Sequence, residues 1–204
     1  LCLFPVTIWR WEYVKRGGFQ LQLTAIISGS ALLLYSTSIV YTDVVRAILL
    51  FYLTPVWGII LGRIFLGDKI STPRIIAMIL AIIGMLTIFG LGAKFPLPQN
   101  LGDWLGLCSG FMWAIAMVLI NKNKNHSTIE LTVGFFQWSL ILSLFAAVLL
   151  SPNNLPSFDK IVPVIPLMLT FMVLLILPGP YASLWGPKYL NPGVVGLLFM
   201  TEIV

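Results

Sequence analysis

The sequence has 204 residues, of which 59% are apolar and only 9% are charged. Soluble domains carry about 25% charged and roughly 45–50% apolar residues, so we expect this chain to be surrounded by lipid. Its formal net charge is +5, but the basic residues form no stripe, which argues against a nucleic-acid partner. The two cysteines, Cys2 and Cys108, lie in apolar runs without a metal-binding spacing, so we expect no metal site and no disulfide.

Apolar runs of helical length predict membrane spans, because about 20 apolar residues cross a bilayer. In chain order the predicted helices are Leu1–Ile8 (the end of one), Leu21–Val40, Val44–Leu66, Thr72–Gly90, Trp104–Ile120, Ile129–Leu150, Val164–Trp185 and Gly193–Val204 (the start of one). The links between them are short and leave no room for a soluble catalytic domain. Since apolar runs are interrupted at both ends, we expect the sequence to be a fragment of a longer protein.

The basic residues predict which side of the membrane each link faces, since cytoplasmic loops are enriched in Lys and Arg. If the link Trp9–Phe19 is cytoplasmic, alternation of the helices places nine basic residues on that side and three on the other. The nine are Arg10, Lys15, Arg16, Arg63, Lys69, Arg74, Lys122, Lys124 and Lys188; the three are Lys94, Lys160 and Arg46. This uneven distribution also supports the number of helices, because one helix more or fewer would move the later links to the opposite side and make the distribution more even.

Two segments suggest an internal repeat. Aligned without gaps, Tyr41–Val56 and Tyr189–Val204 share a tyrosine, two leucines, a phenylalanine and a valine. Under the orientation above, the two segments begin on opposite sides of the membrane. Repeats of inverted topology are typical of secondary transporters.

Five short segments carry motifs that point to a known family. They are Leu53–Val56, Leu61–Ile70, Ile82–Met85, Gly102–Ala114 and Met200–Ile203. They resemble the Ser-Pro-Val, Leu-Gly-Glu and fifth-helix glycine motifs, the Trp-Ala pair and the Leu-Glu-Pro segment of EamA-type transporters, in the drug/metabolite transporter superfamily. Here Thr54 replaces the Ser, Asp68 replaces the Glu and Ile203 replaces the Pro.

This resemblance implies an all-α, polytopic helical membrane protein with two inverted five-helix repeats, ten helices in the full-length protein. The sequence would then run from late helix 2 to early helix 9. Residues 1–92 would be most of the first repeat, 93–102 a link and 103–204 the second repeat. The implied function is secondary transport of a small metabolite, with amino acids as the first guess, by alternating access and in the outward direction. The implied location is the bacterial inner (plasma) membrane.

Two other classes of function stay open beside transport. One is a non-transporting assembly or receptor subunit. The other is a membrane-embedded lipid enzyme, against which the lack of a nucleophile or metal cluster speaks. No nucleotide-binding G-x-x-x-x-G-K-[ST] motif occurs, and the only histidine, His126, lies in a predicted loop. We therefore expect no cofactor and no catalytic residues. The expected partners are the bilayer, a small-molecule substrate and protons as a coupling ion, and the sequence leaves the oligomeric state open.

Glu202 is predicted to lie near mid-membrane, well inside the helix that begins at Gly193. A carboxylate at the bilayer centre costs roughly 2.5–3.5 kcal/mol, so it should border water, find a partner or be protonated. We interpret it as a proton or cation site or as a contact for a substrate amine. The alternative is a structural hydrogen bond between helices.

Arg46 follows Asp43 by about one helical turn. It is interpreted either as a side chain that reaches the interface and pairs with Asp43, or as a carboxylate-binding group at the mouth of a cavity. Asp103 is expected to cap the N-terminus of its helix.

Three further side chains are candidates for lining a cavity. Trp113 shares a helix face with Gly106 and Gly110, a small-residue pattern that allows close helix contact. It belongs either to the core or, as the resemblance implies, to the substrate pocket. Tyr35 and Gln137 lie on polar stripes of their helices, and such stripes face a neighbouring helix or water.

Helix breaks are the last predicted feature, because interrupted helices mark binding sites in transporters. The predicted breaks are at Pro55 and at Pro178, Gly179 and Pro180. A proline leaves a carbonyl without its helical donor, and within a membrane that group needs a partner from protein or from a wet cavity. Tyr181 and Trp185 follow the second break and are interpreted either as substrate-stacking or as packing residues.

Overall fold

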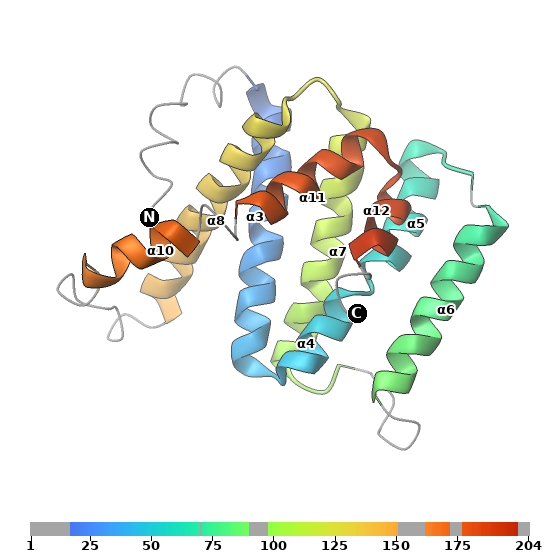
Figure 1. The fold of residues 1–204 in the computed structure, drawn as a ribbon, viewed down its shortest axis with the longest axis horizontal. Coiled ribbons are helices and arrows are strands. Elements are labelled where there is room, and N and C mark those ends of the chain that lie inside the picture. Colours follow the sequence, from blue (N-terminus) through green and yellow to red (C-terminus); the bar gives the residue numbers. More distant parts are fainter. Residues whose placement is uncertain (1–16, 70, 90–97, 151–161, 172–176, 200–204) are drawn as a thin grey trace.

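The computed structural model describes residues 17–69, 71–89, 98–150, 162–171 and 177–199. Regular structure in these ranges is helical (Figure 1). The helices are α3 (Gly18–Tyr41), α4 (Val44–Phe51), α5 (Thr54–Leu66), α6 (Thr72–Phe89), α7 (Leu101–Lys122), α8 (Thr128–Leu150), the 3-10 turn η2 (Val162–Val164), α10 (Ile165–Phe171), α11 (Pro178–Tyr189) and α12 (Pro192–Phe199).

Within the described ranges, four segments are long and apolar enough to cross a membrane. They are Gly18–Tyr41, Val44–Leu66, Leu101–Lys122 and Thr128–Leu149, the second being formed by α4 and α5 together. Large apolar side chains also lie exposed on the outside of the bundle, among them Ile79 and Leu80 of α6 and Phe145 of α8. Such a surface is suited to lipid. The prediction of a polytopic helical membrane protein is therefore confirmed.

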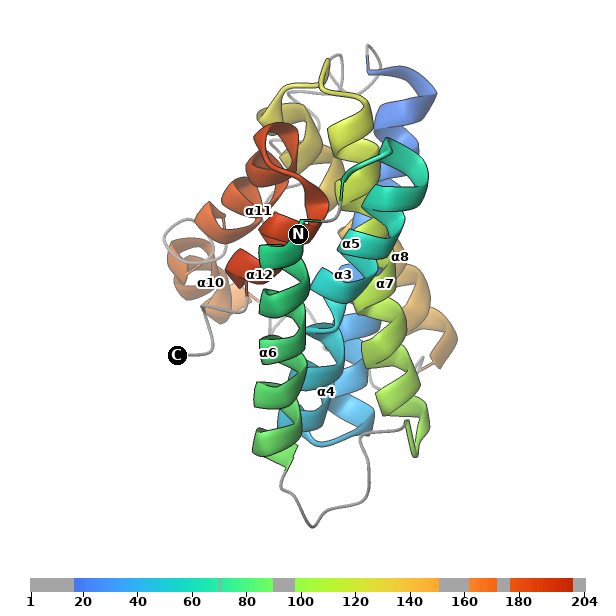
Figure 2. The ribbon, with the colours of Figure 1, turned by 90° about the vertical axis from the view of Figure 1, so that its right-hand side faces the viewer.

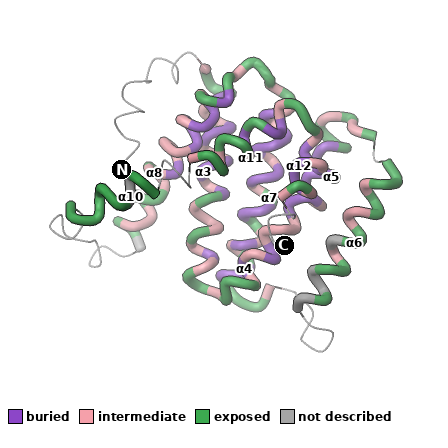
Figure 3. Tube along the Cα trace, viewed as in Figure 1, coloured by how far each residue is buried: buried purple, intermediate pink, exposed green. Residues whose placement is uncertain are grey.

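Helix α7 lies at the centre of the molecule. It packs against α3, α4, α5, α11 and α12, and α3 also packs along α8. Figure 2 shows α7 next to α5 and α3, and Figure 3 shows the buried positions concentrated on α7 and its neighbours. Helices α6 and α10, at opposite edges of the view, are mostly exposed.

Three glycines spaced four residues apart let α7 approach its neighbours closely. A Cβ atom at Gly102 would lie 2.7 Å from the backbone nitrogen of Thr42, where α3 turns into α4. At Gly106 it would lie 2.9 Å from Ser38 Oγ, and at Gly110 it would lie 2.6 Å from the carbonyl oxygen of Phe51. Only glycine fits these positions without a shift of the neighbour. The contact between α7 and the chain from α3 to α5 therefore depends on this glycine row.

The segments that suggested a repeat have matching helix boundaries. Helix α3 ends at Tyr41 and α11 ends at the aligned Tyr189, while α4 begins at Val44 and α12 at the aligned Pro192. Figure 1 shows α4 beginning at the bottom of the view and α12 at the top, so the two helices run in opposite directions. The pairs α3–α4 and α11–α12 therefore share boundaries at aligned residues and have opposite senses.

The predicted helix Val164–Trp185 differs most from the structure. Two described helices, α10 and α11, occupy this region, and α11 continues past Trp185 to Tyr189. Pro187 lies inside α11 although proline has no backbone N–H to donate. The side-chain amide of Asn121 donates to the carbonyl oxygens of Pro187 at 2.7 Å and of Leu190 at 3.0 Å. This amide from α7 satisfies carbonyls at the end of α11, so the helix extends one turn further than expected.

Candidate functional site

A buried ion pair joins the start of α4 to the start of α7. The guanidinium of Arg46 donates from Nη2 to Asp103 Oδ2 at 2.5 Å and from Nε to Oδ1 at 3.2 Å. The Asp103 side chain has no exposed surface, whereas that of Arg46 is 23% exposed. Asp103 also accepts a hydrogen bond from Thr42 Oγ1 at 2.6 Å and one from the backbone nitrogen of Gln99 at 2.9 Å. The carboxylate is thus bound on all sides by donors.

This arrangement corrects two expectations. Arg46 binds Asp103 rather than Asp43, and Asp43 instead caps α4 by accepting from the backbone nitrogen of Val45 at 2.9 Å. Asp103 does not cap α7, because Asn100 takes that role by accepting from the Asp103 backbone nitrogen at 2.8 Å. Through Asp103, the Arg46 side chain joins α4 to α7; the predicted binding of a substrate carboxylate by Arg46 stays a prediction.

The break at Pro55 lies between α4 and α5. Helix α4 ends at Phe51 and α5 begins at Thr54, with Pro55 in its first turn. Proline removes the donor that would bond to the carbonyl four residues earlier, which is that of Phe51. Thr54 Oγ1 donates to this carbonyl at 2.5 Å and lies 3.4 Å from the carbonyl oxygen of Gly110. The freed group is therefore satisfied by protein.

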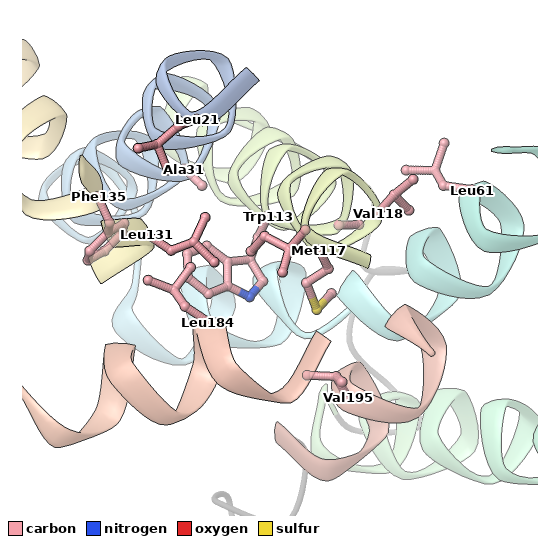
Figure 4. Close-up of a cluster of buried hydrophobic side chains, with 12 residues drawn as sticks. Leu21, Ala31, Leu61, Trp113, Met117, Val118, Leu131, Phe135, Leu184 and Val195 are labelled. Atoms are coloured by element: carbon pink, nitrogen blue, oxygen red, sulfur yellow. The ribbon is translucent and has the colours of Figure 1, made fainter. Parts of the chain in front are cut away.

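Trp113 lies in the buried cluster where α7 meets α3, α8, α11 and α12 (Figure 4). Its side chain is 8% exposed, and its ring packs edge-on against Phe135 of α8, with centroids 5.9 Å apart. Figure 4 shows the indole between Leu184 of α11 and Met117 of α7. Its Nε1 is buried and finds no hydrogen-bond acceptor among the described residues. The apolar cluster thus holds a free donor, and Trp57, which packs against it, has a second buried indole nitrogen without a partner among the described residues.

The other predicted cavity residues lie at different depths. Tyr35 is half-buried, with its ring 5.0 Å from that of Phe51. Its polar stripe on α3 faces protein, since Ser38 Oγ donates to the Gly102 carbonyl at 2.7 Å. Gln137 is half-buried, and its Oε1 has no donor among the described residues. No hydrogen bond between described residues brings Tyr35, Gln137 and Trp113 together.

The residues around the second predicted break belong to α11. Pro178, Gly179 and Pro180 form the first turn of α11, where a proline costs no hydrogen bond. Tyr181 is 41% exposed, and Trp185 is 47% exposed, with its ring 4.8 Å from that of Tyr189. Glu202 lies outside the described residues. The roles predicted for Tyr181, Trp185 and Glu202 remain predictions.

The described residues contain no group of His, Cys, Asp and Glu side chains that could hold a metal ion. Cys108 is an exposed free thiol, and Cys2 lies outside the described ranges. The described part of the chain thus contains the Arg46–Asp103 ion pair at one end of the bundle and the unpaired indole nitrogen of Trp113 in the buried cluster.

Two comparisons with known proteins bear on this chain. Residues 1–90 match the EamA-like transporter family. The predicted resemblance is thereby confirmed over the segment that holds Arg46 and Pro55. An uncharacterized transporter of Helicobacter pylori is 20% identical over 146 residues, which is 70% of this chain and 47% of that relative. The chain thus spans about half the length of this relative, and both similarities are to transporters, which supports an integral membrane protein with an EamA-like N-terminal part.

The Arg46–Asp103 pair is the feature that sequence reasoning missed. Both residues stand near the starts of predicted helices, and alternation of the helices places them on the same side of the membrane. Two opposite charges at the same depth are expected to pair, because an unpaired charge is costly there. The shared depth of Arg46 and Asp103 could have indicated the pair, but Asp43 is closer to Arg46 in sequence and was the more obvious partner.

Proposed function

We propose that this chain is part of a secondary transporter that moves a small polar metabolite across the bacterial inner membrane by alternating access. An amino acid is the first substrate class to test, and export the first direction. The similarity of residues 1–90 to EamA-like transporters supports the transporter class. The matched boundaries and opposite senses of α3–α4 and α11–α12 support two inverted repeats that rock about a central site.

The buried indole N–H of Trp113 is the observation that carries the position of the site. Leaving a buried donor unpaired costs about 1–3 kcal/mol. Trp113 lies on α7 in a cluster that receives side chains from α3 and α12, the helices of the proposed first and second repeats. A carboxylate or carbonyl oxygen of a bound solute would accept this hydrogen bond and remove the cost.

The remaining contacts follow from the chemistry of an amino acid. Glu202 supplies a carboxylate for the substrate amine or for a coupling proton. Gln137, whose Oε1 is buried without a donor in the described part of the chain, supplies a second acceptor for the amine. Tyr35, Tyr181 and Trp185 supply aromatic surface for the side chain of the solute. Arg46 is left out of this proposed set because Asp103 binds it.

The proposal is tested by counterflow of labelled amino acids into liposomes that contain the full-length protein. The informative variant is Trp113→Phe, which keeps an aromatic ring and removes the donor. Loss of one hydrogen bond should raise KM by roughly 3- to 10-fold and leave the maximal rate much less affected.

The matched control is Trp104→Phe on the same helix. Trp104 is 55% exposed, so this substitution should leave KM unchanged. If Trp113 only packs in the core, both variants will have the KM of the wild type. If the protein is an assembly subunit, the wild type itself will move no solute, and the transporter proposal is then lost.

A further inference from the structure

Two hollows flank the C-terminal end of α7 and share residues. The larger, about 500 Å³, lies between α7 and the start of α3 and includes Phe19 and Gln20 in its lining. The smaller, about 210 Å³, lies between α7 and α5 and includes Leu61 and Phe65. Leu119 and Lys122 of α7 line both. The two hollows therefore adjoin along Leu119 and the positively charged Lys122.

The smaller hollow is an apolar groove with one cation at its end. Apart from Lys122, it is lined by five apolar side chains: Leu61, Phe65, Ile115, Val118 and Leu119. Phe65 is 60% exposed, on the outside of the bundle. A groove of this kind between membrane helices accepts a hydrocarbon chain and excludes a polar solute, because a polar group would find no partner in it.

The larger hollow, unlike the apolar groove, has polar side chains at its rim. Gln20 at the start of α3 and Asn123 after the end of α7 both line it, and the Asn123 side-chain amide donates to Gln20 Oε1. Phe19, beside them, is 79% exposed. The rim thus offers amides and a cation at the membrane surface.

Lys122 is free to bind an anion. It is exposed, and no carboxylate of the described residues forms an ion pair with it. The start of α3 and the ends of α5 and α7 lie at the same end of the molecule (Figures 1 and 2). The distribution of basic residues predicts that this end is cytoplasmic. The cytoplasmic leaflet is the one whose negative surface attracts basic residues close to membrane helices.

We propose that the two hollows bind one anionic phospholipid of the cytoplasmic leaflet. The phosphate contacts the Lys122 ammonium and the side-chain amide nitrogen of Gln20, whose oxygen Asn123 holds in place, and one acyl chain lies in the groove between α5 and α7. Charge complementarity at Lys122 selects an anionic lipid over a zwitterionic one. This site lies apart from the proposed substrate site at Trp113 and does not depend on the transport proposal.

The test measures which lipid the full-length protein retains. Protein in detergent is incubated with equal amounts of phosphatidylglycerol and phosphatidylcholine, and the bound lipids are counted by native mass spectrometry. The wild type should prefer phosphatidylglycerol, and Lys122→Gln should lower that preference by about fivefold, the effect of one basic residue near an anionic surface. Lys124→Gln is the matched control, because Lys124 is exposed and lines neither hollow.

A second variant separates the acyl chain from the head group. Leu119→Trp places a larger side chain between the two hollows and should reduce retention of phosphatidylglycerol, with the charge of Lys122 unchanged. Inorganic phosphate at millimolar concentration should not displace the lipid, because it has no chain to place in the groove. The proposal is overturned if Lys122→Gln keeps the wild-type preference, if Lys124→Gln loses it equally, or if phosphate displaces the lipid fully.

Discussion

At the scale of single residues, the pairing of Arg46 with Asp103 dominates the energetics. Removing a carboxylate from water costs several kcal/mol, and only a close partner with further hydrogen bonds offsets this cost. Asp103 has such partners in Arg46, Thr42 and the backbone of Gln99. Breaking such a pair costs more than the pair contributes, because it leaves one charge without its partner.

We therefore expect Asp103→Asn to lower the free energy of unfolding by about 2–4 kcal/mol, toward the low side of buried pairs because Arg46 retains some exposure. The measurement is unfolding in mixed detergent micelles, followed by tryptophan fluorescence. Asp43→Asn is the control, since asparagine caps a helix about as well as aspartate and the change should be close to neutral. Equal unfolding free energies for the two variants would contradict the assigned pairing.

The residue scale also shows where sequence reasoning reaches its limit. Asn100 and Asp103 are both good capping residues and stand three positions apart, so residue type cannot decide which one caps α7. The decision is made by tertiary structure, because packing of α7 on α4 brings Arg46 to Asp103. The Arg46–Asp103 contact spans 57 residues of chain, and no local pattern encodes it.

At the scale of elements, the helices follow from apolar run length. The predicted span Val44–Leu66 begins where α4 begins and ends where α5 ends, because Asp43 caps the start and Gly67 follows the end. The start of α6 at Thr72 was also predicted. The end of α11 could not be predicted, since the carbonyls of Pro187 and Leu190 accept hydrogen bonds from Asn121, which lies on another helix. Trp113 could be predicted as a candidate, but its unpaired nitrogen is visible only in the packed cluster.

The glycine row of α7 makes a prediction at the same scale. In Gly110→Ala, the added Cβ would lie 2.6 Å from the Phe51 carbonyl oxygen and 3.0 Å from Thr54 Oγ1. Helix α7 must then move away from the α4–α5 break, and such overpacking costs about 1–3 kcal/mol. The same unfolding assay measures this loss.

Gly84→Ala in α6 is the matched control, because a Cβ there meets nothing within 4 Å. Alanine is the better helix former by up to about 1 kcal/mol, so this variant should be neutral or more stable than the wild type. A stable Gly110→Ala protein with an unstable Gly84→Ala protein would show that the close contact has been assigned to the wrong helix.

At the scale of the whole molecule, the two proposed repeats meet at surfaces of different character. The contact of α3 and α4 with α7 carries the buried ion pair and the Ser38–Gly102 hydrogen bond. In the contact of α5 with α12, glycines of α12 lie close to the backbone of α5. A Cβ at Gly196 would lie 2.8 Å from the Pro55 Cα, and one at Gly193 would lie 3.3 Å from the Ile59 Cα. Small sliding of packed helices is one of the ways in which proteins change conformation, whereas helices joined by a polar network can part only if its hydrogen bonds break.

Alternating access therefore predicts that α5 and α12 move relative to each other while α3 and α7 stay together. In a variant with Cys2 and Cys108 replaced by serine, the pair Ile59→Cys and Gly193→Cys should form a disulfide that stops counterflow until a reductant is added. The pair Ser38→Cys and Gly106→Cys, where Ser38 Oγ lies 2.9 Å from the position of a Cβ at Gly106, should form a disulfide that leaves counterflow largely intact. Both pairs join the first proposed repeat to the second, so the comparison separates moving from fixed contacts. Wild-type counterflow in the oxidised Ile59–Gly193 pair would show that transport does not need α5 and α12 to part.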